Sequence, residues 1–129
     1  MTNEILKHEW KQFFDRLSQD RLEWQTRVEV FQDHIGAQVL SDGLPLMGFM
    51  LEDKADGQNA IEIMLGEESG AHQMHTIFNL QKVFFKEDEN NQSGIIEIED
   101  ESGAKTLIHL VQPIAVLVTY EETQIVAQS

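Results

Sequence analysis

The chain has 129 residues, no cysteine and a formal net charge of −14 at pH 7, from 23 acidic and 9 basic side chains. This length fits one domain, and the absence of cysteine excludes disulfides, thiol nucleophiles and thiolate metal sites. A strongly negative surface repels phosphate groups, so we expect neither nucleic acid nor a membrane as a partner. We expect a single globular domain over residues 1–120 and a frayed tail over residues 121–129.

The N-terminal segment, MTNEILKHEWKQFF, carries charge every few residues and lacks the unbroken apolar run of a secretory signal. The longest apolar run, residues 114–118, is much shorter than the ~20 residues that cross a bilayer. We therefore expect a cytoplasmic protein.

One amphipathic helix is predicted near the N-terminus, between Asn3 and Leu22, with Asn3 as its N-cap. Its apolar residues recur at the spacing of one helix face, and they are Leu6, Trp10, Phe13, Phe14 and Leu17. This aromatic stripe is expected to pack over a sheet as part of the core. The alternative is a groove for a ligand or partner.

After residue 20 the apolar period changes from 3.6 to 2, which is typical of strands with one buried face. Strands are predicted at residues 24–30, 37–40, 44–52, 60–65, 95–99, 104–111 and 114–120, and residues 74–78 and 82–86 form either one bent strand or two. Turns are predicted at residues 33–36, 41–43, 53–59 and 100–103, and residues 87–94 are the segment most expected to be disordered.

These elements predict a mainly β (α+β) fold. The N-terminal helix packs on a curved antiparallel sheet of about seven to eight strands, which we expect to close into a small barrel. A parallel α/β sheet is disfavoured, because no helical period separates the strands.

Several segments together resemble an uncharacterised bacterial family of short acidic proteins, classed as a domain of unknown function. They are HEWKQFFDRLSQ, WQTRVEVF, LPLMGFMLED, GQNAIEIMLGEESGAHQMHTI and IIEIEDESGAKTLIHL, so the resemblance covers residues 8–111. The pairing of AIEIMLG with HTI is its most specific part. The resemblance implies a bacterial, stand-alone single domain, and it brings no catalytic residue, cofactor or substrate.

One group of side chains suggests a metal site. His72 and His75 follow the acidic pair Glu67 and Glu68, and imidazole with carboxylate suits zinc or another divalent transition metal. Residues three apart on a strand point to opposite faces, so both imidazoles reach one ion only if the backbone turns between them. Gly70 makes a turn conceivable. The alternative is that both histidines bond to backbone or solvent.

Other candidate groups have simpler explanations. Glu97 and Glu99 lie on one strand face at about 7 Å, near the carboxylate spacing of inverting glycosidases, but their apolar neighbours should turn them to water. His109 alternates with apolar residues and is expected to pack within the sheet. No nucleophile elbow or phosphate-binding loop is present in the sequence, and we expect no cofactor.

Two functions remain open. The first is a non-enzymatic protein-interaction or ligand-binding domain, with a homodimer formed through the strand from Ile114 to Tyr120, in the apolar run PIAVLVTY. The second is a metal-binding protein or metal-dependent enzyme that uses His72, His75 and Glu68. We favour the first, because no catalytic set stands out.

Overall fold

The computed structural model describes residues 2–67, 70 and 72–113. The helices are η1 (Lys7–Glu9), a short 3-10 helix, and α1 (Trp10–Asp20), and the strands are β1 (Thr2–Ile5), β2 (Gln25–Gln32), β3 (Gly36–Asp53), β4 (Asn59–Gly66), β5 (His72–Phe78), β6 (Leu80–Glu87), β7 (Ser93–Asp100) and β8 (Lys105–Val111). This confirms the predicted mainly β fold with a helix near the N-terminus. Within these residues, no helix is both long and apolar enough to cross a membrane.

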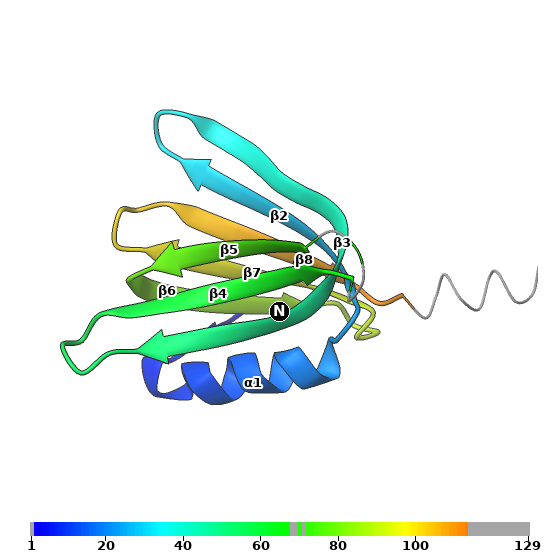
Figure 1. Cartoon of the computed structure of the whole chain (residues 1–129), viewed down its shortest axis with the longest axis horizontal. Helices are drawn as coiled ribbons and strands as arrows, with labels where there is room; N and C mark the ends of the chain where they lie inside the picture. Colours follow the sequence, from blue (N-terminus) through cyan, green and yellow to red (C-terminus); the bar gives the residue numbers. More distant parts are fainter. Residues whose placement is uncertain (1, 68–69, 71, 114–129) are drawn as a thin grey trace, which may run out of the picture.

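The strands form one antiparallel sheet in the order β1-β6-β7-β8-β2-β3-β4-β5. The sheet curls, so that the second half of β3 with β4 and β5 lies in front of the remaining strands (Figure 1). It does not close, because β1 and β5 remain as separate edges, and the expected barrel is wrong in this respect.

Helix α1 gives the physical reason for the open sheet. Its Phe14 ring contacts Phe49 of β3 at 5.3 Å between ring centroids, and its Phe13 ring contacts Phe85 of β6 at 5.4 Å. The helix therefore packs between β3 and β6, along the lower side of the curl in Figure 1. Aromatic side chains, rather than further strand pairing, cover the apolar surface on that side.

Strand β3 joins the two halves of the sheet. Its first part pairs with β2 as far as Pro45, opposite Gln25, and its second part pairs with β4 from Leu46 onward. The turn predicted at residues 41–43 is wrong, because register shifts against β2 keep these residues within one strand. Proline has no backbone N–H, so it suits the position where β3 exchanges one partner strand for the other.

The N-terminal residues differ from the prediction of one long helix. Asn3 lies in β1 opposite Phe85, so it does not cap the helix. Leu6 is 50% exposed, and α1 begins only at Trp10. The indole N–H of Trp10 donates to the carbonyl of Ile5 at 2.9 Å, which fixes the start of the helix to β1. Backbone pairing with β6 thus replaces the first helical turns.

The helix and both halves of the sheet share one hydrophobic core. The alternation predicted from the sequence is confirmed there: Ile61 and Ile63 of β4 and Ile96 and Ile98 of β7 are fully buried. The core residues are Trp10, Phe14, Leu17, Trp24, Val28, Leu46, Phe49, Ile61, Ile63, Leu65, Ile77, Leu80, Val83, Ile96, Ile98, Ile108 and Leu110.

Residues 88–92 form a defined turn where disorder was expected. The carboxylate of Asp88 accepts hydrogen bonds from the backbone N–H of Gln92 at 2.9 Å and from the hydroxyl of Ser93 at 3.0 Å. These bonds lower the pKa of Asp88 below its ordinary value, and the bond from Gln92 has the largest effect. Local hydrogen bonds to a side chain therefore order a polar segment whose composition predicts disorder.

Removing the Ser18 hydroxyl is expected to loosen the helix from the sheet. Its Oγ donates to the carbonyl of Phe14 at 2.8 Å and accepts from the N–H of Phe49 at 2.9 Å. Phe49 is buried, so Ser18→Ala leaves its N–H unpaired and should lower the free energy of unfolding by about 1–3 kcal/mol. Urea denaturation measures the change. Gln19→Ala, at an exposed position of α1, is the control, and equal stability of the two variants would contradict the assignment.

Candidate functional site

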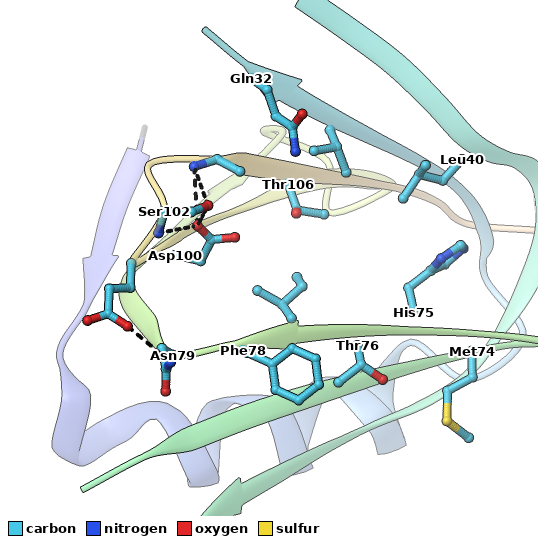
Figure 2. Close-up of a pocket in the computed structure, with 14 residues that line it drawn as sticks. Gln32, Leu40, Met74, His75, Thr76, Phe78, Asn79, Asp100, Ser102 and Thr106 are labelled. Atoms are coloured by element: carbon cyan, nitrogen blue, oxygen red, sulfur yellow. Dashed lines mark hydrogen bonds between the residues drawn. The ribbon is translucent and has the colours of Figure 1, made fainter. Parts of the chain in front are cut away.

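A cleft of about 620 Å³ opens beside β5, bounded by the hairpins β2–β3 and β7–β8 (Figure 2). This volume lies in the range of about 300–1,000 Å³ that is usual for binding sites. Apolar and polar side chains both line it, and they are Val30, Gln32, Leu40, Met74, His75, Thr76, Ile77, Phe78, Asn79, Asp100, Glu101, Ser102, Ala104 and Thr106.

A corner at Asn79 fixes one end of the cleft. Asn79 has φ 58°, a left-handed conformation that asparagine adopts more readily than most residues, and it turns the chain from β5 into β6. Its N–H donates to the carbonyl of Asn59 at 2.7 Å, and the Asn59 side-chain oxygen accepts from the N–H of Leu80 at 2.7 Å. The side-chain amide of Asn79 donates to the Glu101 carboxylate at 3.0 Å. The corner therefore ties β4, β5 and the β7–β8 turn together.

The β7–β8 turn forms the adjoining wall. The carboxylate of Asp100 accepts hydrogen bonds from the N–H groups of Ser102 at 2.9 Å and Ala104 at 3.2 Å, which Figure 2 marks with dashed lines. Gly103 takes a φ of 88°, which closes the turn. Because the side chain of Asp100 holds its own loop, the wall is fixed and carries negative charge.

His75 is the histidine that lines the cleft. It lies opposite Ile63 of β4, on the inner face of the sheet, and Figure 2 shows its ring toward the β2–β3 hairpin with Met74, Thr76 and Phe78 on the other side of β5. Its Nε2 atom is buried and has no hydrogen-bond partner among the described residues. Burial lowers the pKa of His75, so the ring is neutral at pH 7 and offers one donor and one acceptor.

The structure separates the two histidines of the predicted metal site. His72 and His75 lie in one uninterrupted strand, so they point to opposite faces, and the bend at Gly70 comes before both of them. Glu68 lies outside the described residues. Within residues 2–67, 70 and 72–113, no group of three or more histidine, aspartate or glutamate side chains is placed to hold a metal. A site that includes Glu68 stays a prediction.

The other candidate groups lie on the outer face of the sheet, away from the cleft. The Nε2 atom of His109 is 3.5 Å from the Glu29 carboxylate. Glu97 and Glu99 flank buried positions of β7, and Glu99 lies 3.5 Å from the ammonium group of Lys105. These carboxylates face neighbouring side chains and solvent, as the sequence indicated.

The free edge of β5 is the feature that the sequence analysis missed. Asn79 and Asn59 form a hydrogen-bonded pair, and hydrogen-bonded and non-bonded pairs alternate along an antiparallel ladder. Counting back from Asn79, Phe78, Thr76 and Met74 belong to the non-bonded pairs. Their N–H and C=O groups therefore point away from β4. Among the described strands β5 pairs with β4 alone, so these groups face the open side of the strand.

A sequence signal for this edge does exist. The segment HQMHTIF of β5 contains no aspartate, glutamate, lysine or arginine, whereas every other described strand contains at least one. Large apolar side chains are exposed on the outer face of this part of the sheet. In β5, Met74 is 59% and Phe78 67% exposed, and in β3, Met50 is 50% exposed. An edge with this composition has none of the charges that usually block strand pairing.

His75 should make the stability of the protein depend on pH. Its pKa in the folded chain is below 6.5, so as the pH falls past 6.5 the unfolded chain binds a proton at this residue first. The free energy of unfolding then decreases. We expect the melting temperature to fall less in His75→Gln than in the wild type between about pH 7.5 and about pH 5. His34→Gln, in the exposed β2–β3 turn, serves as control, and equal losses in wild type and His75→Gln would argue against this role.

Comparisons with known proteins identify the family. The model of a family of unknown function, DUF5335, matches residues 1–118, a range that extends beyond residue 111, where the resemblance seen in the sequence ends. An uncharacterized protein of Aquifex aeolicus (strain VF5) is 28% identical over 109 residues, which cover 84% of this chain and 91% of that protein. No solved structure matches the chain. The expected resemblance to an uncharacterised bacterial family is thus confirmed, and the chain belongs to the DUF5335 family.

Proposed function

We propose that this protein is an interaction domain that binds an extended polypeptide segment along the free edge of β5. The observation that carries the proposal is the course of the cleft, which follows six consecutive residues from Met74 to Asn79. A groove beside an unpaired strand edge fits a polypeptide in extended conformation, which can add to the sheet as a further strand.

Backbone groups would supply the affinity. The N–H and C=O groups of Met74, Thr76 and Phe78 face the groove, and an added strand pairs with them as β4 pairs with the opposite edge. Alternate side chains of the added strand would enter the cleft, where Leu40 and the unpartnered His75 are available for contact. This arrangement combines a binding mode that depends little on sequence with pockets that select side chains.

The two strands at the ends of the strand order are unequal. The other edge strand, β1, has four residues and carries Glu4, so it is short and charged. Strand β5 has seven residues, and it contains no proline and no formally charged residue. Since proteins usually protect exposed edges with charge, proline or shortness, the unprotected edge is the better candidate for pairing.

The walls of the cleft limit the chemistry of the bound segment. Leu40 and Ile77 favour apolar side chains, while Thr106 offers a hydroxyl. The carboxylates of Asp100 and Glu101 line one end, and the chain carries a net charge of −14. A segment whose cleft-facing residues are uncharged, whether apolar or polar, suits these walls best.

Peptide selection tests the proposal. Peptides of about seven residues selected from a random library on the full chain should lack acidic residues at the alternate positions that face the cleft, and fluorescence polarisation measures their affinity. Thr76→Pro removes an N–H that β4 does not use and blocks the edge, so it should weaken binding at least about tenfold. Thr76→Val keeps the N–H and the side-chain volume and is the matched control. Selected peptides that bind Thr76→Pro as well as Thr76→Val would refute strand addition at β5.

A further inference from the structure

We infer that the partner at this edge is a second copy of the same chain, joined by antiparallel pairing of the two β5 strands across a two-fold axis. The inference rests on the proposed function and names the occupant of the site. It would extend the front part of the sheet, β3–β4–β5, continuously into the β5, β4 and β3 strands of the second copy.

The lack of charge on β5 permits a second copy at this edge. Two chains with a net charge of −14 each repel one another over most of their surfaces. The carboxylates of Asp100 and Glu101 lie only at one end of the cleft, and β5 itself has no carboxylate, lysine or arginine. An uncharged edge within an acidic chain suits a partner that is equally acidic. It is the strand surface on which like-charge repulsion is least.

The hydrogen-bonding pattern of β5 permits full pairing with itself. Full overlap of two antiparallel β5 strands sets the two-fold axis at His75, with Met74 opposite Thr76 and His72 opposite Phe78. The backbone groups of Met74, Thr76 and Phe78 point to the free edge, so these opposed residues form the hydrogen-bonded pairs. Both strands then use their free donors and acceptors along the whole overlap, without a shift in register.

The side chains also gain from this pairing. On the outer face, Met74 and Phe78, which are 59% and 67% exposed, are brought beside the second strand. On the inner face, His75 meets His75 of the second copy at a non-bonded pair, where side chains approach closely. One neutral imidazole can donate to the other, which gives the buried Nε2 atom the partner that it lacks in the single chain.

The strand predicted from Ile114 to Tyr120 is the competing dimer contact. It lies outside the described residues, so its prediction is separate from the pairing of β5. The two contacts can be distinguished in the full chain, because a proline at Thr76 blocks the β5 edge, whereas a proline at Val116 interrupts the predicted strand.

Sedimentation equilibrium of the full chain over a wide range of concentration tests the inference. We expect a dimer in the wild type and in Thr76→Val, and a dissociation constant raised at least about tenfold in Thr76→Pro, since the change acts in both copies. Val116→Pro should keep the wild-type constant. Raising the salt concentration from about 50 mM to about 500 mM should tighten the dimer, because it screens the repulsion between two acidic chains.

A second variant covers the case in which Thr76→Pro fails to fold by circular dichroism. Thr76→Glu leaves the backbone unchanged and places a carboxylate opposite Met74 of the other copy, so it should also give monomers. A monomeric wild type overturns the inference, as does a dimer that survives Thr76→Glu or one that only Val116→Pro disrupts. The proposed function is tested separately from the dimer. If the wild type is monomeric but selected peptides lose affinity in Thr76→Pro, the proposed function stands and the partner is not a second copy.

Discussion

The packing of the aromatic face of α1 between β3 and β6 is the constraint on which the rest of the structure depends. A curled sheet of these strands has apolar surface on its inside, and something must cover it. Phe13 and Phe14 do so from the helix, through ring contacts with Phe85 and Phe49. Because the helix covers this side of the curl, the sheet needs no closing strand pair. The free edge of β5 ends the strand order on the other side of β4, and the cleft lies beside it.

Regular periodicity explains which parts of the fold could be predicted from the sequence. Along β7 and β8, buried residues alternate with partly exposed ones, and the inward isoleucines of β4, β7 and β8 are fully buried. The helix was recognised from the spacing of Trp10, Phe14 and Leu17. Its start was placed too early, because the pairing of β1 with β6 joins residues far apart in the sequence and leaves no local pattern.

The candidate site was harder to predict, since it depends on the edge of β5 that no other described strand pairs with. The sequence singles out His75 as a possible metal ligand, in a site that needs a turn between His72 and His75. Whether they share a face depends on the continuity of β5, which local composition does not reveal. The polar corner at Asn79 was likewise not anticipated: its importance comes from hydrogen bonds to Asn59 and Glu101, both distant in the sequence.

The pairing of β2 with β8 has a consequence for how the chain folds. β2 to β5 form one series of hairpins and β6 to β8 form another, so each series can pair locally as it leaves the ribosome. The two series are joined by the ladder between β2 and β8, in which Gln25 meets Val111. Contacts this distant in sequence form late and slow folding. During synthesis, one edge of β2 therefore stays unpaired until β8, the last described strand, has been made. In this period the risk that β2 pairs with another chain is greatest.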